Sequence, residues 1–146
     1  MRPPEIDDDI NYYVVFDAAK YDHWIYRFVD RSMGHVYAVK DLNDFQWLVI
    51  QPRVNMTDVK IMLKCQYPVI QMIAGPDAKV VRVKVKYPMK ARGTVNFFTC
   101  VEQVKALLGI KSFFTLTPKQ LYNGLIGGRY ESNRESTACR YKGFRC

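Results

Sequence analysis

The sequence predicts a single α+β domain with an antiparallel sheet at its centre. A chain of 146 residues with 49% hydrophobic residues is one domain by length and can bury a real core. Short runs of β-branched and aromatic residues between turn residues are typical of strands. Two later segments carry apolar residues at helical spacing instead, so both kinds of element are expected in one fold.

The N-terminal half is predicted to contain three strands. A flexible lead covers 1–11, and the single domain is expected to span 12–128. The strands are expected at 12–16, 35–40 and 45–51. Hairpin-turn residues at 41–44 join the last two of these strands. The segment 22–30 fits either a short helix or a strand, and the helix is favoured.

The middle of the chain is predicted to hold one helix and two strands. Residues 56–64 can form a helix, with Thr57 or Asn55 as its cap. Residues 69–74 and 79–87 are predicted strands, joined by a Gly-Pro-Asp turn.

Cys100 is predicted to be the first residue of an amphipathic helix. Thr99 can act as the N-cap, with Glu102 closing a capping box, and Gly109 is a suitable C-terminal stop. The apolar positions at helical spacing are Val101, Val104, Leu107 and Leu108. Because the helix dipole and the free amides of the first turn stabilise a thiolate, this position favours a reactive cysteine.

The last helix is predicted to begin at the Thr117-Pro118 pair and to end at the two glycines 127–128. The tail 129–146 is rich in Arg, Ser, Tyr and Gly without an apolar period, so an extended basic arm is expected. Such an arm could dock on a neighbouring subunit through its basic residues, which include Arg134, Arg140, Lys142 and Arg145.

The net charge of +8, from 22 Lys and Arg against 14 Asp and Glu, favours anionic partners. Nucleic acid, an acidic wall polymer, a phospholipid surface and an acidic protein face all fit. In the run 81–86 valines alternate with basic residues, which favours a strand with one solvated face over a nucleic-acid strip. No apolar run reaches the roughly 20 residues of a membrane span. The polar, acidic start shows no signal peptide, so synthesis in the cytoplasm is expected.

The four cysteines are not spaced as metal ligands. They include no Cys-x-x-Cys pair, and both histidines lie far from any cysteine cluster, so we expect no zinc site and no other cofactor. Cys139 and Cys146 are free thiols in a cytosolic setting or a disulfide under oxidising conditions. Cys65 is expected to be buried.

A nucleophilic Cys100 needs a base, and His35 is the candidate because it opens a strand after a glycine turn. Gln51 ends the next strand and could orient the imidazole, while Trp47 could wall the site. The backbone amide of Cys100 would supply one oxyanion donor. Asn96 is the candidate for the second donor, although a plain turn residue explains Asn96 equally well.

Three further side chains have chemistry that suits such a site. Asp41 and Asp44 are alternative orienting groups, but their place in a turn favours solvated carboxylates. The other histidine, His23, is assigned a structural role.

The chain resembles the permuted papain-like cysteine hydrolases, the NlpC-type group in which the histidine precedes the cysteine. The resemblance rests on Gly34-His35-Val36, 47–52, 96–109 and the closing helix at 117–122. It implies a papain-like fold, in which the central antiparallel sheet packs against the cysteine helix. It also implies the roles of nucleophile for Cys100, base for His35 and orienting group for Gln51. The strings 98–105 and 107–110 are also similar to small uncharacterised proteins of tailed bacteriophages.

Two hypotheses of function follow. In the first, the protein is a cysteine hydrolase that cleaves an amide bond, such as one in a peptidoglycan stem peptide, through an acyl-enzyme. In the second, it is a structural component of a bacteriophage virion or tail that keeps the same scaffold with or without catalysis. Nucleic-acid binding through the basic strand is a third idea, and it requires affinity that falls steeply with salt.

Overall fold

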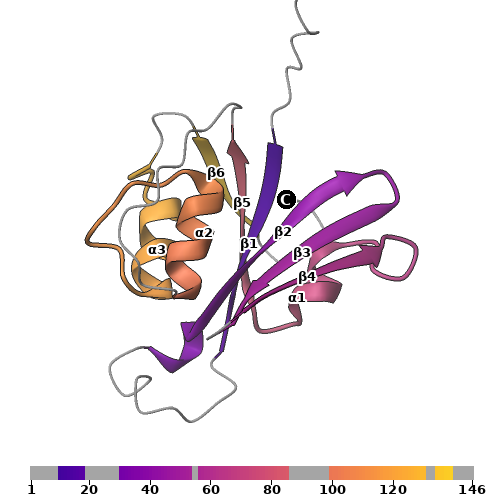
Figure 1. Cartoon of the computed structure of the whole chain (residues 1–146), viewed down its shortest axis with the longest axis horizontal. Helices are drawn as coiled ribbons and strands as arrows, with labels where there is room; N and C mark the ends of the chain where they lie inside the picture. Colours follow the sequence, from indigo (N-terminus) through magenta and orange to yellow (C-terminus); the bar gives the residue numbers. More distant parts are fainter. Residues whose placement is uncertain (1–9, 19–29, 54–55, 86–98, 131–133, 140–146) are drawn as a thin grey trace, which may run out of the picture.

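The computed structural model describes residues 10–18, 30–53, 56–85, 99–130 and 134–139. Its strands form one six-stranded antiparallel sheet in the order β4-β3-β2-β1-β5-β6 (Figure 1). The strands are β1 (Ile10–Asp17), β2 (His35–Asn43), β3 (Gln46–Pro52), β4 (Thr57–Leu63), β5 (Lys79–Val85) and β6 (Arg134–Cys139). The helices are α1 (Ile70–Ala74), α2 (Cys100–Leu108) and α3 (Pro118–Ile126), with a short 3₁₀ turn at Arg31–Met33.

Strands β1 to β4 are neighbours in both sequence and space. Strands β2 and β3 are joined by a tight hairpin, and their register shifts once, between Asp41 and Asn43, as at a β-bulge. Strand β5 then pairs with β1, which leaves β4 at one edge of the sheet and β6 at the other. The strands predicted at 12–16, 35–40 and 45–51 are therefore confirmed within a few residues of their observed ends, and the strand predicted at 79–87 is confirmed over Lys79–Val85, with 86–87 outside the described residues.

Helices cover both faces of the sheet, and each face has its own core. Helices α2 and α3 lie together over one face, where Phe16 and Val36 pack against their apolar residues. Helix α1 covers the other face, which is lined by Tyr37 and Trp47. Because side chains alternate along a strand, successive residues of β2 contribute to opposite cores. This alternation decides which predicted site residues can meet.

The predicted papain-like fold is wrong. The described residues build a sheet-rich domain of antiparallel strands with few and short helices, and the arrangement is not papain-like. The cysteine helix does pack on the sheet, as expected, but α2 spans only nine residues and α1 only five.

The secondary structure of two neighbouring segments is the reverse of the prediction. The helix expected at 56–64 is strand β4, and part of the strand expected at 69–74 is helix α1. In β4, β-branched Val59 and Ile61 alternate with charged Asp58 and Lys60, which is the two-residue period of a strand. The α1 segment is a continuous apolar run with one glutamine, and such runs do not distinguish a helix from a strand.

The C-terminal region differs from the expected free arm. Residues 134–139 form β6 and pair along β5, so this part of the predicted arm belongs to the sheet. The chain also continues in turns past the predicted stop at 127–128 as far as Tyr130. The predicted lead at 1–11 overlaps β1, which begins at Ile10, and its earlier residues lie outside the described part of the chain.

Candidate functional site

Cys100 lies where the sequence predicts it, at the first position of α2. The Thr99 side chain caps the helix, because its Oγ1 accepts a hydrogen bond from the Glu102 amide at 3.2 Å. At the other end Gly109 adopts the left-handed conformation with φ of 64°, which a glycine adopts without steric cost. The helix, its Thr99 cap and its end at Gly109 are thus confirmed, but the Glu102 carboxylate, which was predicted to close a capping box, pairs with Lys105 instead.

The surroundings of the Cys100 thiol do not activate it. The side chain packs against the core under α2 and α3. Burial raises the pKa of the Cys100 thiol, and hydrogen bonds from the backbone amides of Val36 and Val101 oppose that rise without reversing it. A helix N-terminus stabilises a thiolate most when nothing desolvates it, and here desolvation is the larger effect.

His35 faces the opposite side of the sheet from Cys100. Its ring stacks on Tyr37 at a centroid distance of 5.9 Å, and Tyr37 belongs to the core under α1. Val36, the residue between them, points into the core that Cys100 joins. Side chains of neighbouring strand residues point to opposite faces of the sheet, so Val36 faces Cys100 and His35 faces away from it. The predicted acid–base pair is therefore not formed.

The other predicted site residues do not complete the pair. Gln51 lies on β3 two residues beyond Val49, so strand alternation places it on the α1 face with His35 and away from Cys100. Trp47 is buried on that same face and donates from Nε1 to the Tyr67 carbonyl at 2.7 Å. Asn96 lies outside the described residues.

The two carboxylates considered as alternative orienting groups, Asp41 and Asp44, have other surroundings. Asp41 forms an ion pair with Lys64 at 2.6 Å, and the Lys64 ammonium lies 4.4 Å from the centre of the Trp47 ring. Asp44 is an exposed turn residue, as expected. Cys65 is an exposed free thiol, so the prediction that it is buried is wrong. His23 and the basic residues predicted for partner binding, apart from Arg134, lie outside the described residues, and Arg134 contributes backbone to β6.

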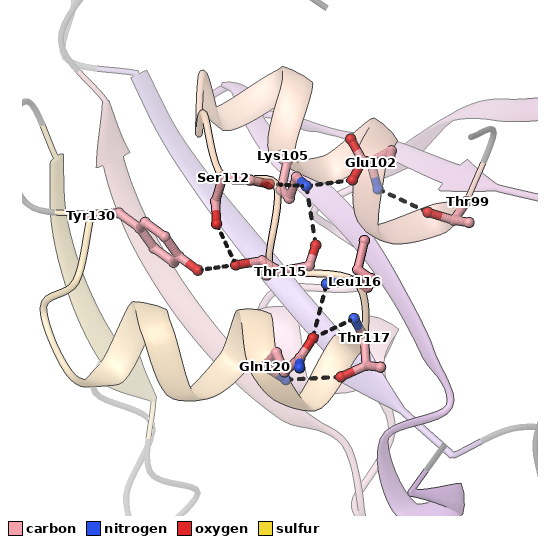
Figure 2. Close-up of polar contacts among 9 residues, drawn as sticks. All are labelled: Thr99, Glu102, Lys105, Ser112, Thr115, Leu116, Thr117, Gln120 and Tyr130. Carbon is pink, nitrogen blue, oxygen red and sulfur yellow. Dashed lines mark hydrogen bonds and ion pairs between the residues drawn. The ribbon is translucent and has the colours of Figure 1, made fainter. Parts of the chain in front are cut away.

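A polar network that the sequence analysis missed lies at the end of α2. The Lys105 side chain is only 3% exposed, and its ammonium binds three acceptors (Figure 2). These are the Glu102 carboxylate, the Ser112 carbonyl at 2.7 Å and the Thr115 carbonyl at 3.0 Å. A lysine ammonium has three N–H donors, so the buried charge is fully hydrogen-bonded. The signal in the sequence was a lysine four residues after Val101, on the apolar side of the helix.

The loop between α2 and α3 is fixed from several directions. Thr115 is buried, and its hydroxyl shares hydrogen bonds with Ser112 at 2.9 Å and with the Tyr130 hydroxyl at 2.6 Å. The Tyr130 ring lies against Gly124 of α3, where an added Cβ would fall 2.7 Å from the ring carbon Cζ. Any side chain at position 124 would therefore displace the Tyr130 ring from this position.

A capping box holds the end of this loop. The Thr117 hydroxyl accepts from the Gln120 amide at 3.2 Å, and the Gln120 side chain accepts from the Thr117 amide at 3.1 Å. The same Gln120 oxygen also accepts from the Leu116 amide at 2.9 Å (Figure 2). The predicted start of the last helix at Thr117-Pro118 is confirmed, and the cap also fixes the backbone before it.

The loop thus held displays three exposed apolar side chains. Phe113, Phe114 and Leu116 are 65%, 89% and 62% exposed. Ile110, which precedes them, and Thr115, which lies between Phe114 and Leu116, are buried. We name residues 110–117 the apolar loop. An ordered backbone that exposes two phenylalanines and a leucine is a surface suited to binding, because large exposed apolar groups otherwise lower solubility.

No protein-family model matches the chain, and no curated protein or solved structure is significantly similar to it. Within the described residues, no group of three or more His, Cys, Asp and Glu is placed to hold a metal ion. Among those residues, too, no helix has the length and hydropathy needed to cross a membrane.

Proposed function

We propose that the protein is a structural docking subunit that inserts its apolar loop into an apolar groove on another protein. The proposal keeps the structural role of the second hypothesis drawn from the sequence, a component of a bacteriophage particle, but replaces the papain-like scaffold with the observed fold and the basic arm with the apolar loop as the docking element. The observation that carries the proposal is the exposure of Phe113, Phe114 and Leu116 on a loop whose backbone is held by a buried lysine.

The rigidity of the loop supports a protein partner over a lipid surface. Binding to a shaped groove gains affinity when the binding residues are already ordered, because less conformational entropy is lost. The contacts of Lys105, Thr115 and Gln120 provide that order. Insertion into a fluid membrane interface gains nothing from a fixed loop shape, so the network favours a protein groove.

The charge around the loop indicates the partner's chemistry. Lys111 within the loop is exposed, and the whole chain carries a net charge of +8. An apolar groove with an acidic rim would complement this surface, and the charges would speed association.

The test is site-specific photo-crosslinking in the native host, with a photoreactive phenylalanine analogue placed at position 114 or, as control, at position 45. Phe45 is 77% exposed in the hairpin between β2 and β3 and serves as a matched exposed phenylalanine away from the loop. The expected result is one discrete protein adduct at position 114 that is absent at position 45.

Binding to the purified partner then gives the magnitude. Phe114→Ser should weaken binding at least about thirtyfold, the size of an interface hot spot, while Phe45→Ser leaves it unchanged. Equal adducts at both positions, or anionic vesicles that bind the chain in a Phe114-dependent way without any protein adduct, would refute the proposal.

A further inference from the structure

We propose that two copies of this chain associate through their β4 edges, antiparallel and in a register centred on Ile61, so that two sheets become one. The inference does not rest on the proposed function of the apolar loop. It rests on three properties of β4: the direction of its backbone groups, its apolar face and the order of its charges.

The backbone of β4 has a side that no described strand uses. Among the described strands, β4 pairs only with β3. The Arg53 amide donates to the Met56 carbonyl, and the Lys64 amide donates to the Phe45 carbonyl. Because hydrogen-bonded pairs alternate along an antiparallel ladder, the even-numbered residues of β4 are the ones that bond to β3. The N–H and C=O groups of Val59, Ile61 and Leu63 therefore point outward, as on any open sheet edge.

The same three residues form an apolar stripe. Val59, Ile61 and Leu63 are 61%, 58% and 44% exposed and alternate along one face of the strand. On that face the Thr57 hydroxyl binds Gln103 of α2 at 2.5 Å, so the helix covers only the beginning of β4. An exposed edge that is both open and apolar is a template for strand pairing.

The charges of β4 select a second copy in one register. With Ile61 opposite its own symmetry mate, Val59 lies opposite Leu63 and Asp58 lies opposite Lys64, so every residue of the apolar stripe meets another residue of the stripe. A register centred on Lys60 would place two lysines directly opposite each other, which is unfavourable. A register centred on Val59 would leave Leu63 without an apolar partner from β4.

The opposed charges would extend pairs that already exist. Asp58 is bound by Arg53 at 2.7 Å, and Lys64 is bound by Asp41 at 2.6 Å, both on the face that carries Trp47. When Asp58 of one copy lies beside Lys64 of the other, the two existing ion pairs form one row of alternating charge. Its order is Arg53 and Asp58 of one copy, then Lys64 and Asp41 of the other. Because the interface is twofold, this row forms twice, as an isologous dimer requires.

The first experiment is sedimentation velocity of the full chain over a concentration series, with Ile61→Lys as the test variant. The wild type should sediment as a dimer, and Ile61→Lys should raise the dimer Kd at least roughly a hundredfold, because two ammonium groups would then face each other. Met72→Lys is the control, since Met72 is 54% exposed on α1, and it should stay dimeric. A wild-type monomer, or a dimer that persists in Ile61→Lys, overturns the proposal.

The second experiment tests the register and does not depend on the stability of Ile61→Lys. Directly opposite, hydrogen-bonded residues have Cα atoms about 5.5 Å apart, within the span of a disulfide. In a Cys65→Ser background, Ile61→Cys should therefore give a covalent dimer on mild oxidation, while Val59→Cys and Lys60→Cys should not. Cross-linking strongest at position 59 or 60, or equal to the background at all three, contradicts the proposed register.

Discussion

The two faces of the sheet are built from different residues, and the difference explains why the predicted catalytic pair is absent. The face under α2 and α3 is mainly aliphatic, takes in the Cys100 side chain and ends at the buried Lys105. The face under α1 buries Tyr37 and Trp47 among aliphatic residues and carries His35 beside Tyr37. Adjacent residues on one strand serve opposite cores, so spacing along the sequence alone could not bring the cysteine and the histidine together.

The largest expected effect comes from the buried charge on the α2–α3 face. Lys105→Met keeps the length of the side chain but leaves the carbonyls of Ser112 and Thr115 without their donor. Breaking a buried, fully bonded group in this way should lower the free energy of unfolding by about 3 kcal/mol. Urea denaturation of the wild type and the variant measures this difference in the free energy of unfolding.

The matched control for this variant is Lys119→Met. Lys119 is also paired with a carboxylate, that of Asp30 at 2.9 Å, but its side chain is 53% exposed. Removing a surface pair should change the free energy of unfolding by less than about 1 kcal/mol. Equal losses in the two variants would mean that burial of Lys105 contributes nothing to the stability of this face.

The α1 face should show its own dependence on pH through Tyr37. Burial, and then the Asp17 carboxylate, raise the pKa of the Tyr37 hydroxyl to about 12. An unfolded tyrosine ionises near pH 10, so the contribution of Tyr37 is complete below pH 10 and is lost as the pH rises toward 12. The loss should reach about 2 kcal/mol at pH 12 and approach about 3 kcal/mol above it, because each of the two units of pKa difference corresponds to about 1.4 kcal/mol.

Comparison with Tyr37→Phe isolates this effect. The variant cannot ionise at that position, so its free energy of unfolding should fall less steeply than that of the wild type between pH 10 and 12. Parallel curves for the two proteins would show that the Tyr37 hydroxyl is solvated in the folded state.

The sequence was a good guide where local chemistry decides the structure. The caps at Thr99 and Thr117, the stop at Gly109 and the alternating valines of β5 each produce the predicted element, because caps and side-chain periods act within a few residues. The segments of β4 and α1 were exchanged, since a short apolar run suits either state and tertiary packing decides.

The candidate site was less predictable, because it depends on which face each strand residue occupies. A one-residue difference in the start of β2 would turn His35 toward Cys100, and nothing local in the sequence fixes that choice. The Lys105 network was missed for a related reason. Its acceptors are backbone carbonyls of a loop, and their direction follows from the fold and not from the identity of Ser112 or Thr115.

The most direct test of the separated faces is the pH dependence of Cys100 alkylation, followed peptide by peptide with mass spectrometry in the wild type and in His35→Ala. Burial raises the pKa of the Cys100 thiol, so its alkylation should be slow at neutral pH and should rise only above the usual thiol range of about 8.5. The exposed Cys65 should react faster in both proteins. We expect the same Cys100 profile with and without the imidazole. A Cys100 that reacts rapidly at neutral pH, and loses that reactivity in His35→Ala, would contradict the account.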